Sequence, residues 1–326
     1  MNNKIMRIIS DASWMPYSLD AGFEHINFVK TTREQVSAAA FLDNRFLTED
    51  NEMQTFPIRD LIGLDIGHFV KPSFIFHSAF CCSTLMAGAL NISGKVLVLK
   101  EPEIIMSLAN AKRMFVRINK TEQDYQTLSK LIIELLSRRF MPQEAIVIKA
   151  TNAANNLVED IRAMKIPFIM MQSSLEDFLV SVLKKGESCK SFIRNQYNIF
   201  TLDPGPLSQI NPRQAMTLTD LQVACLVWRH QMQIFEQQGK GQSIINDQDF
   251  LREKDQTILL VADALGLGMT STDVTTLMAS GFFSKNSKFK NENLNTKQRT
   301  NEAKDVFHRY QSEITDTLNW NKHLTF

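Results

Sequence analysis

The sequence is poor in cysteine and has no excess of either charge. Its 326 residues include four cysteines without CxxC spacing or a nearby histidine cluster, at Cys81, Cys82, Cys189 and Cys225. A zinc site and a disulfide framework are therefore not indicated, and we expect reduced thiols, a cytoplasmic protein and no bound metal. With 36 basic and 35 acidic residues, the chain has no net field that would gather nucleic acid. An anionic ligand must instead meet a few local cations in a pocket.

Long apolar runs are also absent. No window approaches the roughly 20 apolar residues that cross a bilayer, so no membrane span is expected. The short apolar run within residues 1–18 is interrupted by arginine and lacks a small-residue cleavage site, which is a poor match to a signal peptide. A hydrophobic fraction of 44% beside 22% charged residues is typical of a globular protein with a large core.

Short apolar segments alternate with helical patterns between residues 72 and 186. Strands are predicted at PSFIFHS, GKVLVLKEP, EAIVIKAT and IPFIMMQS, which begin at residues 72, 94, 144 and 166. Helices are predicted over residues 31–47, 83–90, 121–140, 155–164 and 175–186. This alternation predicts right-handed crossovers and an α/β fold with a doubly wound, mostly parallel sheet.

The pattern changes from Leu207 onward. Three segments there are predicted to be helical, with no strong strands between them: 218–238, 250–266 and 300–320. Residues 284–300, SKNSKFKNENLNTKQRT, are polar and basic and are predicted to form a loop. We therefore expect a single domain over residues 1–326, composed of an N-terminal extension (1–70), a parallel-sheet core (71–205) and a helical C-terminal part (206–326).

Polar residues follow the predicted strands at the edge where parallel sheets place their ligands. The turns beyond the carboxyl ends read HSAFCCST, KEP, KATN and QSS in chain order. Ser83 and Thr84 begin a helix whose free N–H groups and dipole favour an anion. Glu101 and Lys149 bring an acid or base and a cation to the same edge. His77 is the nearest titratable side chain, and we interpret it as bonding a backbone carbonyl rather than acting in chemistry.

The first of these turns is not a nucleoside-triphosphate P-loop. The pattern GxxxxGK[ST] needs two glycines and a lysine, whereas FIFHSAFCCSTLMAGALN, residues 74–91, has no glycine before Gly88 and no lysine. The segment from Phe80 to Leu85 instead resembles the phosphosulfate-binding loop of the sulfotransferase family. In that comparison Phe80 stands in place of the family's cation and Cys82 in place of its glycine.

The resemblance continues in order to about residue 185. Glu101 is similar in placement to the glutamate base of carbohydrate sulfotransferases, and Lys149 resembles the lysine of their Glu-Lys-Thr-Pro segment. SSLEDFLVS resembles the segment in which an arginine and a serine hold the 3′-phosphate of the donor, with Ser173 at the arginine position and Ser181 at the serine position. The resemblance thus implies a P-loop-like fold of the sulfotransferase type and 3′-phosphoadenosine 5′-phosphosulfate as donor, without a metal. The donor-binding residues that it implies are Phe80, Cys81, Cys82, Ser83, Thr84, Ser173, Ser181 and Lys288.

Two cations of the family pattern are missing, at Phe80 and Ser173. We hypothesise that other lysines supply the charge, the candidates being Lys100, Lys149, Lys285, Lys288 and Lys290. Each site residue also has a structural interpretation. Ser83 and Thr84 fit a helix cap and its neighbour, Glu101 fits an exposed carboxylate, and the two adjacent cysteines fit small packing residues better than reactive thiolates.

The leading functional hypothesis is an enzyme that transfers a sulfuryl group to the hydroxyl or amine of a small-molecule or carbohydrate acceptor. Glu101 is its expected base and Lys149 its expected cation. The alternative is a nucleotide- or phosphate-binding protein of the same fold that has lost transfer, which the two missing cations favour. A third hypothesis, an atypical kinase, needs a magnesium site that the sequence does not reveal.

Overall fold

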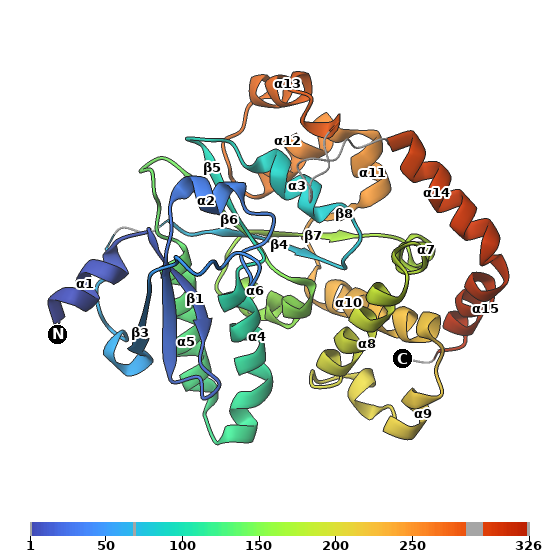
Figure 1. The fold of residues 1–326 in the computed structure, drawn as a ribbon, viewed down its shortest axis with the longest axis horizontal. Helices are drawn as coiled ribbons and strands as arrows, with labels where there is room; N and C mark the ends of the chain where they lie inside the picture. The colour runs from blue at the N-terminus through green and yellow to red at the C-terminus, as the bar shows by residue number, and fades with distance from the viewer. Residues whose placement is uncertain (1, 68–69, 285–295, 325–326) are drawn as a thin grey trace.

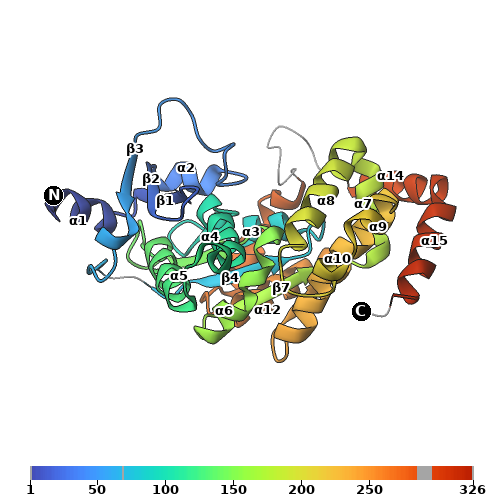
Figure 2. The ribbon, with the colours of Figure 1, turned by 90° about the horizontal axis from the view of Figure 1, so that it is seen from below.

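The computed structural model describes residues 2–67, 70–284 and 296–324. A five-stranded parallel sheet lies at its centre, with helices on both faces (Figure 1). A three-stranded antiparallel sheet from the N-terminal extension lies at one end of the molecule, and the last two helices lie at the other (Figure 2). The predicted α/β class with a parallel sheet is confirmed.

The order of strands in the central sheet is β5-β6-β4-β7-β8. The strands are β4 (Ser73–His77), β5 (Val96–Lys100), β6 (Ala145–Lys149), β7 (Phe168–Gln172) and β8 (Ile244–Asn246). The first four match the strands predicted from the sequence. The fifth contradicts the prediction that the C-terminal half has no strong strands between its helices. Its three residues are too few to show a period in sequence, and they form a strand by pairing with the edge of β7 from Met170 to Gln172.

Alternate residues of the strands pack into two separate cores. Phe74 and Phe76 of β4 lie on one face, where their rings stack with centroids 5.6 Å apart. Ile75, between them, joins the core of the opposite face. A sheet buried on both faces requires apolar residues at every position, which is why these strands read as continuous apolar runs.

The helices of residues 83–200 follow the strands in alternation. They are α3 (Ser83–Leu90), α4 (Glu103–Met114), η2 (Phe115–Ile118), α5 (Glu122–Leu136), η3 (Asn152–Leu157), α6 (Val158–Ala163), α7 (Leu175–Lys185) and α8 (Glu187–Phe200). The predicted helix at 121–140 begins as expected, with a capping box between Thr121 and Asp124. Gly88 of α3 lies where an added Cβ would be 2.7 Å from the ring of Phe282, so this helix can lie close to η5 (Phe282–Ser284) only because position 88 has no side chain.

The N-terminal extension carries α1 (Asn2–Ser10), β1 (Trp14–Leu19), β2 (His25–Lys30), α2 (Arg33–Ala38), β3 (Met53–Pro57) and η1 (Ile58–Asp60). The helix predicted over residues 31–47 is wrong beyond Ala38, because Ala39 adopts an extended conformation. Beyond it, the Leu42 N–H donates to the Lys100 carbonyl at 2.8 Å and the Leu42 carbonyl accepts from the Glu103 N–H at 3.0 Å. The segment after α2 therefore runs along the carboxyl end of β5.

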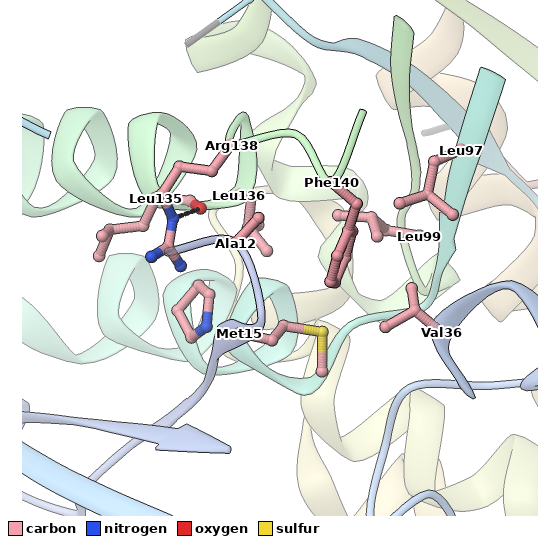
Figure 3. Close-up of a pocket in the computed structure, with 10 residues that line it drawn as sticks. Ala12, Met15, Val36, Leu97, Leu99, Leu135, Leu136, Arg138 and Phe140 are labelled. Atoms are coloured by element: carbon pink, nitrogen blue, oxygen red, sulfur yellow. Dashed lines mark hydrogen bonds between the residues drawn. The ribbon is translucent and has the colours of Figure 1, made fainter. Parts of the chain in front are cut away.

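Arg138 joins the extension to the core. Its buried guanidinium donates to five carbonyl oxygens at 2.6–3.0 Å, those of Ile8, Ile9, Asp11, Trp14 and Leu135. Figure 3 shows the bond to Leu135. Two of these carbonyls belong to the last turn of α1, which the side chain therefore caps. A cavity of about 20 Å³ lies beside Arg138 and is lined mainly by apolar side chains such as Val36, Leu97 and Leu99. It has room for no more than a water molecule, so we interpret it as a packing feature.

The C-terminal part is helical apart from β8. Its helices are η4 (Pro206–Gln209), α9 (Pro212–Met216), α10 (Asp220–Gln238), α11 (Asp247–Arg252), α12 (Lys254–Ala264), α13 (Ser271–Ala279), α14 (Thr296–Arg309) and α15 (Gln311–Lys322), with η5 between α13 and α14. The segments predicted as single helices at 250–266 and 300–320 are each divided, at Glu253 and Tyr310, where the backbone leaves the helical region. Most of the predicted loop at 284–300 lies outside the described residues. Within the described ranges, no helix is both long enough and apolar enough to cross a membrane.

Candidate anion-binding site

The turn between β4 and α3 has the backbone geometry of an anion cradle. Ala79, Phe80 and Cys82 have positive φ angles of 67°, 54° and 59°. Among the described residues, no group accepts a hydrogen bond from the backbone N–H groups of Phe80, Cys81, Ser83 or Thr84. Successive N–H groups in such a left-handed turn at a helix start form a concave site for an anion. We call residues 78–84 the cradle loop.

Backbone strain concentrates at this edge of the sheet. Of the seven non-glycine residues with positive φ in the described ranges, four lie here: the three in the cradle loop and Glu101, with φ of 52°. Each costs about 1–2 kcal/mol relative to an ordinary conformation. Strain held at two adjacent turns motivates a functional hypothesis for the edge that they share.

The hydroxyls of Ser83 and Thr84 are not helix caps. The N-cap of α3 is Cys82, whose side chain makes no capping hydrogen bond, so Ser83 and Thr84 are the first two helical residues. Both residues are buried, at 5% and 8% exposure, and neither hydroxyl bonds to any residue that the structure describes. Unpaired hydroxyls at a helix start are available to a ligand.

Glu101 and Lys149 meet as predicted at the ends of β5 and β6. Lys100 and Lys149 are paired in register, which places Glu101 beside the end of β6, where its N–H donates to the Lys149 carbonyl at 2.7 Å. The Nζ of Lys149, 1% exposed, forms a short ion pair with Oε1 of Glu101, whose side chain is 18% exposed. Glu101 Oε2 accepts no hydrogen bond from a described residue. The exposed-carboxylate interpretation of Glu101 is therefore wrong.

His77 also belongs to this group, and its sequence interpretation needs correction. Among the described residues, the ring contacts a backbone N–H and a side chain instead of a backbone carbonyl: Nδ1 lies 3.0 Å from the Ala79 nitrogen and Nε2 lies 3.0 Å from Nζ of Lys149. Its Nε2 is also 3.7 Å from Oε1 of Glu101. The buried ring thus lies between the cradle loop and the Lys149–Glu101 pair.

Lys100 does not supply charge to the cradle loop. Its Nζ donates to the carbonyl oxygens of Ser37 and Ala39 at 2.8 and 2.7 Å, at the C-terminal end of α2. This arrangement satisfies carbonyls that the end of α2 leaves unpaired. The hypothesis that Lys100 replaces the missing cation is therefore wrong.

The remaining predicted donor residues are placed differently from one another. Ser173 is 1% exposed, and its N–H lies 3.4 Å from Oγ of Ser78 in the cradle loop. The Ser173 hydroxyl is buried with no hydrogen-bond partner among the described residues. Ser181 lies on α7, half-buried, two turns beyond the start of that helix. Lys288, together with Lys285 and Lys290, lies outside the described residues.

A lysine that the sequence analysis missed contacts the cradle loop. The ring of Phe80 packs against Phe178 and Phe192, with centroid distances of 5.2 and 6.4 Å. The Nζ of Lys185, the last residue of α7, lies 3.7 Å from the centroid of the same ring. A cation over an aromatic face is attracted by the ring quadrupole. The basic end of α7 could have suggested this residue, but only the fold brings it to position 80.

Cys81 fits the packing interpretation. Its side chain is fully buried, and burial, followed by the nearby Asp247 carboxylate, raises the pKa of the thiol. Asp247 itself directly follows β8 and is 5% exposed. Burial, and then Asp177, raise the pKa of Asp247 to about 7. This carboxyl was missed because β8 was missed.

The segment after α2 brings a second charged pair to the Glu101 side of the edge. Arg45 forms a two-pronged pair with Asp43, and Asp43, followed by Glu101, raises the pKa of Arg45. Its guanidinium lies 3.9 Å from the centroid of the Phe41 ring. Burial, and then Asp43, raise the pKa of Glu103. The N-terminal extension therefore contributes to the wall beside Glu101.

A larger hollow lies elsewhere. About 340 Å³ in volume, it is an open hollow lined by residues of α7, α8, α10 and α15, with Asp220, Tyr310 and Glu313 among them. None of the predicted site residues lines it. We therefore keep the candidate site at the carboxyl edge of the sheet.

The fold and this edge define an α/β protein with a glycine-free anion cradle beside a buried lysine–glutamate pair. No protein-family model matches the chain, and no curated protein matches it. Two solved structures of retinol dehydratase are similar to it. One, in a complex with retinol and PAP, has 13% identity over 93% of this chain and 98% of that chain, with a TM-score of 0.35. The other, in complex with androsterone and inactive cofactor PAP, has 12% identity over 85% of this chain and 90% of that chain, with a TM-score of 0.33.

Proposed function

We propose that this chain is a sulfotransferase-type enzyme that binds 3′-phosphoadenosine 5′-phosphosulfate at the cradle loop. The observation that carries the proposal is that His77 links the Lys149–Glu101 pair to the cradle loop, whose N–H groups and hydroxyls at the start of α3 have no partner among the described residues. The first group suits phosphate oxygens, and the second suits a reaction that moves a proton. The sequence resemblance of Phe80 to Leu85 to the phosphosulfate-binding loop supports the same ligand.

In the proposed reaction, the acceptor oxygen or nitrogen forms a bond to sulfur while the bond from sulfur to the bridging oxygen of the donor breaks. The acceptor proton passes to Oε2 of Glu101, the carboxylate oxygen that accepts no hydrogen bond from a described residue. The departing phosphate oxygen gains negative charge, which Lys149 and the N–H groups of the cradle loop stabilise. The acceptor is a small molecule or a carbohydrate that enters beside Glu101.

We further propose that Lys185 provides the cation that the cradle loop lacks. Its contact with Phe80 holds an ammonium against the residue that stands at the family's cation position. An exposed cation–π contact is worth about 0.5–1 kcal/mol, less than a charge-assisted hydrogen bond to a phosphate oxygen. Lys185→Met is then expected to weaken donor-product binding about 5- to 30-fold, which corresponds to ~1–2 kcal/mol.

Lys184 offers a matched control for that measurement. It precedes Lys185 on the same helix, and its Nζ forms an ion pair with Glu302 at 2.6 Å. Lys184→Met removes the same charge from α7, and we expect it to leave binding within about twofold of the parent, because exposed charges contribute little. Equal losses in the two variants, measured by calorimetry, would assign the effect to general charge rather than to Lys185.

The proposed ligand class can be tested by a thermal shift. The desulfated donor product, 3′-phosphoadenosine 5′-phosphate, is expected to raise the melting temperature more than ATP with magnesium does, because the cradle loop has hydroxyls but no P-loop lysine. Stabilisation by magnesium ATP that equals or exceeds this shift would indicate a kinase-like protein instead. No stabilisation by either nucleotide would reject a nucleotide site.

A binding protein without transfer is the second candidate, favoured by the aromatic side chain at Phe80 where a cation is expected. A transfer assay with the donor and a panel of hydroxyl and amine acceptors separates the two candidates. Donor binding with no transfer to any acceptor, and no slow hydrolysis of the donor, would favour the binding protein.

A further inference from the structure

The side chain of His77 contacts both parts of the candidate site. It is the last residue of β4, and its side chain is buried. Its backbone carbonyl accepts a hydrogen bond from Nδ2 of Asn155 at 3.0 Å, which fixes the end of the strand. One ring nitrogen faces the cradle loop and the other faces the Lys149–Glu101 pair.

The contact with the cradle loop determines where the imidazole carries its proton. The Ala79 N–H is a donor, so Nδ1, 3.0 Å away, must accept. A neutral imidazole has one donor and one acceptor nitrogen, and the proton is therefore on Nε2. This hydrogen bond also holds Ala79, whose φ of 67° begins the left-handed part of the loop.

The proton on Nε2 has consequences for Glu101. Among the described groups near Nε2 are Nζ of Lys149 at 3.0 Å and Oε1 of Glu101 at 3.7 Å. The Lys149 ammonium and the Nε2–H are both donors, so neither accepts from the other, and Oε1 is the acceptor that the two can share. A shift of about half an ångström would bring Nε2 and Oε1 into hydrogen-bond range. Nε2–H and Nζ then hold the same oxygen, and Oε2 is left to face the acceptor.

We propose that His77 is a positioning residue that couples the conformation of the anion cradle to the orientation of the Glu101 carboxylate. Its Nδ1 keeps the cradle loop in the binding conformation, and its Nε2–H, together with Lys149, holds the general base. The inference rests on the proposed function, because it assigns separate tasks to the two ring nitrogens within that site.

Two amide variants separate these tasks. In His77→Asn the side-chain oxygen can take the place of Nδ1 and accept from the Ala79 N–H, but nothing reaches the position of Nε2. In His77→Gln the amide NH₂ can reach toward Glu101, but the acceptor for Ala79 is lost. We expect His77→Asn to bind 3′-phosphoadenosine 5′-phosphate within about threefold of the parent and His77→Gln to bind it roughly tenfold more weakly, as for one lost hydrogen bond. In a transfer or donor-hydrolysis assay, we expect His77→Asn to lose kcat with little change in KM.

Equal loss of nucleotide affinity in both variants, with unchanged unfolding curves, would overturn the proposal. The ¹⁵N spectrum of the His77 ring in the parent protein provides a second readout that needs neither ligand nor variant. We expect a protonated Nε2 and an unprotonated Nδ1 in the neutral ring, and a neutral ring with its proton on Nδ1 would overturn the proposal. If the parent binds no phosphate ligand, the proposed function fails separately, and the ring spectrum still decides the link between His77 and the loop.

Discussion

The Lys149–Glu101 pair allows a prediction that does not depend on a known acceptor. Glu101→Gln leaves Nζ of Lys149, 1% exposed, beside a neutral amide, and Lys149→Met leaves the 18% exposed carboxylate without its ammonium. Breaking a fully buried pair costs about 3–5 kcal/mol, and the partial exposure of Glu101 reduces this to about 1–3 kcal/mol for each single variant. The double variant leaves no unpaired charge, so we expect it to lose less stability than the sum of the two, with a coupling energy of about 1–2 kcal/mol.

Urea denaturation of the parent, the two single variants and the double variant measures this coupling, with the fluorescence of the three tryptophans as signal. The exposed pair of Lys120 and Glu24, 2.6 Å apart with 25% and 62% exposure, is a matched control. Its coupling is expected to stay below about 0.5–1 kcal/mol because solvent screens it. A coupling for Lys149 and Glu101 as small as that of the control pair would refute the reasoning. Once a transfer assay exists, Glu101→Gln should lower turnover roughly 10²–10⁴-fold with donor affinity nearly unchanged, whereas Lys149→Met should reduce both.

Three further outcomes are expected. Changing Ser83 and Thr84 together to alanine should weaken binding of 3′-phosphoadenosine 5′-phosphate by about tenfold or more with little loss of stability, since neither residue is the N-cap of α3; unchanged affinity in calorimetry would make the loop structural only. Cys82→Gly should raise the urea midpoint slightly, because relief of about 1–2 kcal/mol of left-handed strain exceeds the roughly 0.5–1 kcal/mol that glycine costs, and a lowered midpoint would contradict the strain at φ 59°. Burial raises the pKa of Asp247 to about 7, so the free energy of unfolding of the parent falls as pH rises from about 4 to 7. The free energy of unfolding of Asp247→Asn should therefore increase relative to the parent between about pH 4.5 and 8. A difference between the two proteins that does not vary with pH would reject this.

The central sheet and the edge that carries the site could be predicted from local patterns. A strand buried on both faces must be apolar throughout, so β4 to β7 are visible as short apolar runs between helical segments. Parallel strands bring their carboxyl ends to one edge, which is sufficient to predict that Glu101 and Lys149 meet. The start of α3 could also be predicted, at Ser83, because a Ser-Thr pair ahead of small and apolar residues is typical of a helix start.

The directions of side chains at that edge could not be predicted. Lys100 and Lys149 stand at matching strand ends, yet one bonds carbonyls of the α2 end and the other bonds Glu101. Which partner a lysine takes depends on what the rest of the chain places beside it. The N-terminal segment that receives Lys100 was predicted as a longer helix, because its apolar spacing is helical and its pairing with the end of β5 is long-range.

The sequence by itself determined the elements with a clear period, the class of fold and the order in which polar turns arrive at the sheet edge, because these follow from local burial and chain connectivity. Only the tertiary structure decided the backbone conformation of those turns and the partners of their side chains. The positive φ angles at Ala79, Phe80 and Cys82 occur in residues other than glycine, so the residue types do not predict them. The positions of His77 and Lys185 result from contacts between segments far apart in the chain. Such contacts depend on how the helices pack on the sheet, and short-range sequence patterns do not predict that packing.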